Sequence, residues 1–371
     1  MFINKDIPEN DKIILNKLGK NVDTPISDLL LHTKYKRKSS IYNRMRNLRE
    51  QKYLYGPYFT INYNAIGVNK LYSVFVFANY NPVYRTVVLE AMRKIDCHTM
   101  IYPVRTAEIY LGIYRCNNWN YIASLFKQMK KWGWLKGYSV RKSEYKWIIQ
   151  NPNFFGDFVP PPDYQIPGGE LPDYCYEDVD SDFEFTSIDL TVLKYLSVRP
   201  YRLTQIRDME YQYRDAQLKY CDLKRSYEKL LQNRILLEKN FVIFPLPLDM
   251  CSLFFFISRG KNFRSHLEMI AHFGKDLRLN KTMIVVGNEI ISYFLTYPLL
   301  EGKILGIIGN KLNFANIYGI KTYPSNELSR KSFNDNYFDL NNQKWIFPYS
   351  QFREELKKLK EKNEKGRDLG S

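Results

Sequence analysis

The sequence predicts an α+β protein in which groups of short helices alternate with β-α-β-β-α-β units. Three observations indicate this class: a basic amphipathic helix near the N-terminus, an ordered series of strands and helices after it, and a return of the same order in the second half. The chain has 371 residues and therefore exceeds one typical domain. We expect several domains, each with its own core.

The first group of helices ends in a strongly basic helix. Residues 11–31 predict two short helices, because short apolar clusters are separated by a glycine and by hydroxyl residues that cap helices. Residues 34–49 contain seven Lys or Arg and no acid, while Ile41, Met45 and Leu48 recur at helical spacing. This pattern predicts a third helix with one apolar face and one cationic face.

A helix of this kind buries one face and presents the other to phosphate. Ser39 and Ser40 offer a hydroxyl cap at its start. Asn43 and Arg46 are residue types that pair with adenine and guanine edges in the major groove. A solvated basic helix without a ligand is the alternative. The predicted DNA-binding residues of this segment are Lys34, Lys36, Arg37, Lys38, Ser39, Ser40, Tyr42, Asn43, Arg44, Arg46 and Arg49.

The residues after the basic helix predict a β-hairpin and then a β-α-β-β-α-β unit. Residues 53–68 break the helix and alternate apolar with polar side chains, so we expect the wing of a winged helix-turn-helix. The unit that follows has the order of a ferredoxin-like domain. Its predicted segments are a strand at 71–79, a helix at 81–95, a hairpin at 98–115, a helix at 118–132 and a strand at 135–147.

The second half repeats this order. Residues 188–196 resemble residues 10–18, and a third helix again precedes a strand. Lys224, Arg225 and Lys229 are the basic residues of this helix that we predict to bind DNA, but acidic residues dilute them, so we expect a weaker DNA reader or a packing element. The predicted fold is therefore tandem winged helix-turn-helix domains, each followed by a βαββαβ ferredoxin-like domain.

Charge is distributed unevenly along the chain. The net charge is +16, and residues 151–190 contain ten acidic and no basic residues, so the remainder carries +26. A long-range positive field favours nucleic acid as a partner. We interpret the acidic stretch as a linker that solubilises the chain or docks on a basic face. No apolar run reaches roughly 18 residues, so we expect no membrane partner and a cytoplasmic, nucleoid-associated location.

The predicted division follows these composition changes. Its parts are a winged helix-turn-helix at 1–68, a ferredoxin-like domain at 69–150, an acidic linker at 151–184, a diverged winged helix-turn-helix at 185–249, a second ferredoxin-like domain at 250–325, and a C-terminal segment with a charged helix at 326–371.

Residues 10–150 resemble the Lrp/AsnC family of transcriptional regulators. The resemblance rests on the order and spacing of Asp11–Leu15, Thr24–Leu29, Met45–Leu48 and Tyr53–Tyr58. It implies a regulator or nucleoid-associated protein that binds double-stranded DNA and associates through its ferredoxin-like domains, here within one chain or between chains. A protein-interaction module that contacts the transcription machinery is the alternative from another functional class.

The resemblance also implies a small-molecule effector site in the hairpin of the ferredoxin-like domain. The family has a glycine-containing turn there, whereas residues 104–108 of this chain lack the glycine. The corresponding turn of the second half contains Gly287, Asn288 and Glu289, which we predict as the effector site.

An enzymatic alternative comes from siroheme decarboxylases, which are similar to this family in both domains and use His and Arg near a tetrapyrrole. His98 with Arg105, or His272, would take that role. The chain has only four histidines and none of the common nucleotide-binding, hydrolase or metalloprotease motifs. We therefore expect no enzymatic activity, no cofactor and no metal.

Overall fold

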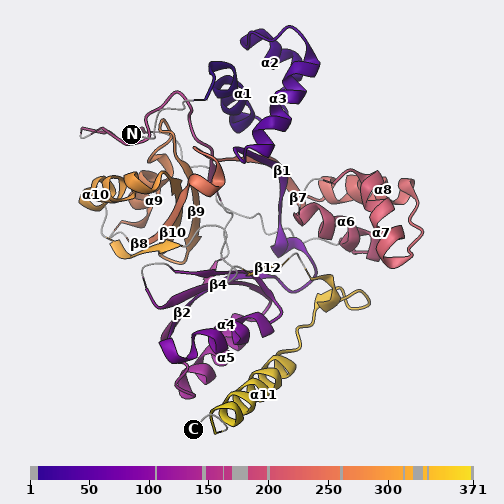
Figure 1. Cartoon of the computed structure of the whole chain (residues 1–371). Coiled ribbons are helices and arrows are strands. Elements are labelled where there is room, and N and C mark those ends of the chain that lie inside the picture. The colour runs from indigo at the N-terminus through magenta and orange to yellow at the C-terminus, as the bar shows by residue number, and fades with distance from the viewer. Residues whose placement is uncertain are drawn as a thin grey trace. The chain divides into compact units, whose positions relative to one another are not determined.

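The computed structural model is a mixed α+β fold with several small antiparallel sheets, as the sequence predicts (Figure 1). No helix among the described residues is long and apolar enough to cross a membrane. The structure describes residues 7–104, 107–143, 148–161, 163–168, 183–198, 201–259, 262–311, 314–320, 329–331 and 334–368.

The chain forms two compact units, and each unit combines segments from both halves of the sequence. The first unit contains 1–60, 145–175 and 238–323, and the second contains 61–144, 176–237 and 324–371. Neither unit is therefore one continuous stretch of chain.

The first unit begins with three helices around a small apolar core. They are α1 (Glu9–Lys20), α2 (Ile26–His32) and α3 (Lys38–Glu50). Ile14, Leu15 and Leu29 are fully buried against the apolar stripe of α3. Helix α3 starts one residue before Ser39, and Arg37 is its N-cap without a side-chain hydrogen bond. The predicted hydroxyl cap is thus wrong, because both serines lie inside the first turn.

A five-stranded sheet completes the first unit. Its strand order is β11-β8-β10-β9-β6. Phe254, Phe256 and Phe294 are fully buried on the face that packs against helix α9. The elements are β6 (Ile148–Gln150), β8 (Ser252–Ser258), α9 (Phe263–His272), β9 (Asn280–Val286), β10 (Glu289–Thr296), α10 (Glu301–Lys311) and β11 (Phe314–Ile320).

The second unit has a sheet with the corresponding order, β12-β3-β4-β2-β5. Its elements are β2 (Tyr72–Tyr80), α4 (Arg85–Lys94), β3 (His98–Pro103), β4 (Ile109–Cys116), α5 (Trp119–Lys131), β5 (Leu135–Ser143) and β12 (Ser329–Arg330). Three helices belong to the same unit: α6 (Ser187–Val198), α7 (Leu203–Arg214) and α8 (Tyr220–Gln232).

The C-terminal segment packs on the second unit. A short hairpin, β13 (Phe338–Asp339) with β14 (Lys344–Trp345), precedes helix α11 (Tyr349–Asp368). Phe352, Leu356 and Leu359 of α11 are buried in the same core as α4 and α5. The few apolar residues of this charged helix are therefore enough to anchor it.

The predicted wing differs from the structure. Strand β1 (Leu54–Ile61) pairs with β7 (Leu236–Ile243) from the other half of the chain, and not with a neighbouring strand of its own half. A period of two in the sequence indicates a strand but does not identify its partner. The strand predicted at 135–147 is β5 over its described part, Leu135–Ser143, and residues 144–147 lie outside the described residues.

Two edge strands are exchanged between the halves. Strand β6, which follows the first β-α-β-β-α-β series, pairs with β9 of the second series, and β12 pairs with β3 of the first. Each sheet therefore needs a strand that the other half supplies.

Cutting the chain between Gly168 and Phe183 tests this exchange. We expect the two fragments to stay together, because β1–β7, β6–β9 and β12–β3 all join one fragment to the other. After protease cleavage at an inserted site, size-exclusion chromatography should still give one complex with the mass of the intact chain, 44.3 kDa. Separation of the fragments at micromolar concentration would contradict the exchange.

Candidate nucleic-acid interface

Helix α3 is held by its apolar face. Ile41 and Leu48 are fully buried and Met45 nearly so, as their helical spacing predicts. Burial of one stripe fixes which side of the helix faces outward, so the remaining positions are presented to solvent.

An ion pair beneath the surface fixes α3 to α1. Arg44 donates from Nε and Nη2 to the two carboxylate oxygens of Asp11. Asp11 is completely buried, and this carboxylate raises the pKa of the Arg44 guanidinium. A two-pronged pair of this kind has a defined geometry. It gives Arg44 a structural task in place of the DNA contact predicted for it.

The other predicted residues of α3 and of the turn before it lie at the surface. Tyr42 is 58% exposed and therefore is not a core aromatic. Arg46 lies 3.9 Å from Glu50 of its own helix. Within the described residues, no carboxylate pairs with the cationic groups before and at the start of the helix. The exposed residues are Lys34, Lys36, Arg37, Lys38, Ser39, Tyr42, Asn43, Arg46 and Arg49, and Ser40 is half-buried.

The basic residues of α8 are placed differently. Lys224 lies 3.7 Å from Glu228, and Arg225 lies 3.8 Å from Asp222. Each of these two predicted DNA-binding residues therefore has a carboxylate on its own helix.

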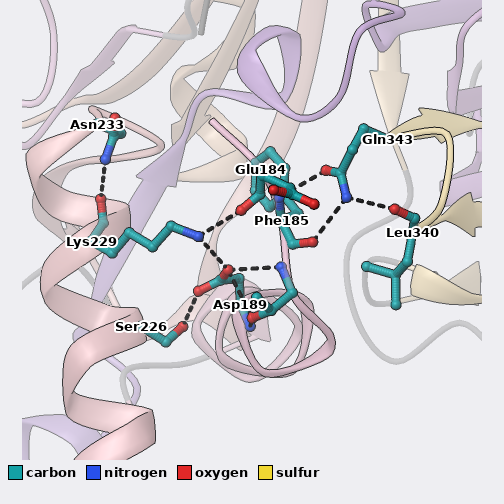
Figure 2. A network of polar contacts seen from close by, with 9 residues as sticks. Glu184, Phe185, Asp189, Ser226, Lys229, Asn233, Leu340 and Gln343 are labelled. Atoms are coloured by element: carbon teal, nitrogen blue, oxygen red, sulfur yellow. Dashed lines mark hydrogen bonds and ion pairs between the residues drawn. The ribbon is translucent and has the colours of Figure 1, made fainter. Parts of the chain in front are cut away.

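Lys229 is part of an internal network (Figure 2). Its Nζ donates to Asp189 at 3.0 Å and to the backbone carbonyl of Glu184 at 2.6 Å. Ser226 also donates to Asp189, at 2.6 Å, so α8 holds the buried aspartate of α6 with two groups. Lys229 thus stabilises the helical group, in the way that Arg44 does beside Asp11.

The same network continues to the C-terminal hairpin. Gln343 accepts a hydrogen bond from the backbone of Phe185 at 2.7 Å and donates to the carbonyl oxygens of Phe185 and Leu340 (Figure 2). The segment before α6 is therefore held by hydrogen bonds from both α8 and the C-terminal hairpin, all within the second unit.

Sequence reasoning did not find a second polar cluster, around Asp96. This carboxylate accepts hydrogen bonds from Lys331, from Asn334 at 3.1 Å and from Tyr337 at 2.8 Å. The partners lie more than 230 residues away along the chain, so no local motif marks them.

His98, the residue of the enzymatic alternative, is next to this cluster. Its Nδ1 lies 3.1 Å from the carbonyl oxygen of Ile95, and burial lowers the pKa of the imidazole to about 4, so the ring is neutral at pH 7. A cavity of about 20 Å³ lies beside it, lined also by Asp96 and Arg115. Arg105 lies outside the described residues, and His272 is buried in α9.

Comparison with known proteins gives fold likeness only. No family model matches the chain, and no curated protein matches it. The solved structure of the siroheme decarboxylase NirDL is similar at 10% identity with a TM-score of 0.46, covering 96% of this chain and all of that one. NirDL in complex with an iron-uroporphyrin III analogue matches at the same identity and TM-score, over 95% of this chain and 98% of the other.

A transcriptional regulatory protein of the AsnC family from Pyrococcus furiosus is similar over a shorter stretch. The identity is 18% and the TM-score 0.28, over 37% of this chain and 88% of that one. The proteins that this chain is similar to thus include a regulator of the AsnC family, matched over part of the chain.

These comparisons correct one expectation. The sequence led us to expect no enzymatic activity, but two similar structures that span nearly the whole chain are of an enzyme, so that expectation is wrong as stated. At this identity, the likeness does not assign their reaction to this protein.

Of the predicted effector residues, Gly287 and Asn288 form an exposed hairpin turn between β9 and β10, and half-buried Glu289 begins β10. Gly287 has a φ of +58°, a conformation that glycine adopts without strain. The backbone conformation of the turn is enough to explain a glycine at this position. The effector role of Gly287, Asn288 and Glu289 stays a prediction. In the corresponding hairpin of the first half, Arg105 and Thr106 lie outside the described residues.

Proposed function

We propose that this protein binds duplex DNA through α3 and acts as a transcription regulator or nucleoid-associated protein. The observation that carries the proposal is the set of exposed cationic side chains on residues 34–49, which lack carboxylate partners among the described residues apart from the paired Arg44 and the long Arg46–Glu50 contact. Phosphate oxygens are the natural ligands for such a surface, because cationic side chains that bind DNA phosphates release the counterions condensed on the DNA.

The positions on α3 suggest a division of tasks. Lys36, Arg37 and Lys38 lie at the entry to the helix and would contact phosphates. Asn43 and Arg46 are three residues apart on the exposed side and would reach base edges, where their side chains can form paired hydrogen bonds. The entry residues would then set affinity, and the latter pair would set sequence preference.

We also infer that the chain is an internal duplication of a winged helix-turn-helix with a ferredoxin-like domain. The matching order of the two large sheets supports this, as does the buried aspartate on the first helix of each helical group. Asp11 is held by Arg44, and Asp189 by Ser226 and Lys229. The domain boundaries predicted from sequence belong to this proposal, which makes the chain an intrachain pseudo-dimer.

Duplex binding across a salt series tests the DNA-binding proposal. The variant has Lys36, Arg37 and Lys38 changed to Ala, and leaves Arg44 in place because it supports the fold. We expect weaker binding on every sequence, and a slope of log K against log salt that is less steep by about 0.9 for each phosphate that the variant no longer neutralises. Fluorescence anisotropy with a labelled mixed-sequence duplex measures both quantities.

A charge-matched control separates this surface from the overall positive charge. Lys127, Lys130 and Lys131 are exposed on α5, and changing them to Ala removes the same number of charges. We expect this control to keep the slope of the wild type. Equal decreases in the two variants would mean that general charge, and not α3, binds DNA.

A further inference from the structure

The basic helices α3 and α8 occupy corresponding places in the two helical groups, but their charge differs. When Leu230 is aligned with Leu48, residues 34–49 correspond to residues 216–231. The first stretch has seven basic and no acidic residues, while the second has four basic and two acidic residues. The net charge therefore falls from +7 to +2.

The structure shows what the remaining cations of α8 contact. Lys224 and Arg225 each have a carboxylate within 4.0 Å on the same helix, and Lys229 is held by Asp189 and Glu184 (Figure 2). Surface pairs of this kind add little stability. However, the carboxylates of these pairs place negative charge where a DNA phosphate would approach the helix.

The carboxylates concerned are open to solvent. The side chain of Glu228 is 54% exposed and that of Asp222 is 35% exposed. A phosphate that approaches Lys224 or Arg225 meets these charges at close range, which raises the cost of binding. Residues 34–49 contain no acid; on α3, Arg44 pairs with the internal Asp11, and Arg46 lies 3.9 Å from Glu50 at the end of the helix.

We propose that the chain binds DNA with one head, meaning one helix that contacts the duplex: α3 binds a single half-site, and α8 serves as a structural helix. The preferred target is therefore one asymmetric half-site per chain, not a two-fold site read by both helices of the pseudo-dimer. This inference rests on the proposed DNA binding. A palindromic site would be filled only by two chains.

The salt dependence on two lengths of duplex tests the inference. One mixed-sequence duplex has about 12 base pairs, little more than one helical turn, and the other has about 30 and spans two half-sites a turn apart. A reader with one head neutralises the same number of phosphates on both, so the two slopes are equal. A reader with two heads neutralises more phosphates on the longer duplex, and its slope becomes steeper there.

Three variants locate the phosphate-binding helix on the longer duplex. Changing Lys224 and Arg225 to Ala leaves the slope unchanged, whereas changing Lys36 and Arg37 to Ala makes it less steep by about 1.8. Asp222→Lys with Glu228→Lys converts α8 to an unopposed basic helix and makes the slope steeper. Circular dichroism confirms that each variant is folded.

The outcomes separate this inference from the proposal beneath it. If wild type binds neither duplex at low salt, the DNA-binding function is wrong and the inference ends with it. If wild type binds, but the slope decreases as much in the Lys224 and Arg225 variant as in the Lys36 and Arg37 variant, DNA binding stands and the one-head inference is overturned. A steeper wild-type slope on the longer duplex overturns it as well.

Discussion

Asp11→Ala should lower the free energy of unfolding of the first helical group by about 3 kcal/mol, the lower end of the range for breaking a buried ion pair. The side chain of Asp11 is completely buried, while that of Arg44 is 23% exposed. Without the carboxylate, the guanidinium keeps a partly buried charge and two unpaired donors. Its remaining exposure is the reason to expect the lower end of the range.

Hydrogen exchange of the α1 and α3 amides measures this decrease, because the two units need not unfold together. Asp11→Leu with Arg44→Met is the matched control, since an apolar pair of similar size removes both charges. We expect the double variant to recover most of the stability. A change below about 0.5 kcal/mol in Asp11→Ala would show that the pair does not anchor α3.

Lys281→Met should destabilise the first unit by about 3 kcal/mol, because it leaves several buried acceptors without a donor. Lys281 is 1% exposed, and its Nζ donates to the carbonyl oxygens of Ile270 at 2.7 Å, Ala271 at 2.9 Å and Phe273 at 2.7 Å. These oxygens lie at the C-terminal end of α9. Burial lowers the pKa of Lys281 to about 7, while the negative end of the helix favours the ammonium form.

Urea unfolding followed by hydrogen exchange in α9 and β9 measures the destabilisation. Lys275 supplies the control, because it is exposed a few residues away, and Lys275→Met should change the stability by less than about 0.5 kcal/mol. If both variants were equally stable, the helix end would be satisfied by other donors, and Lys281 would not cap it.

Local patterns predicted the elements well, because period and capping act within a few residues. The stripe of Ile41, Met45 and Leu48 is buried as expected, and the helix predicted at 118–132 is α5. Strand partners were not accessible in this way. Strand β1 pairs with a segment about 180 residues away, and nothing in an alternating pattern identifies a distant partner.

The same distinction between local patterns and distant contacts applies to the candidate site. The cationic surface of α3 follows from helical periodicity, so its exposed residues were predicted from sequence. The pairing of Arg44 with Asp11 was not, since it joins two helices 33 residues apart. Arg44 also sits at the boundary between the buried stripe and the surface, where charge alone does not tell a ligand contact from a structural pair.

The exchanged edge strands also affect the order of events during synthesis. Strand β6 leaves the ribosome about 130 residues before its partner β9, and β3 precedes β12 by more than 200. Strand β6 therefore waits without a partner, and the sheet of the second unit has an open edge at β3, until most of the chain is made; unpaired strands and open edges pair readily with other chains. The nascent protein should depend on chaperones until its last strands emerge.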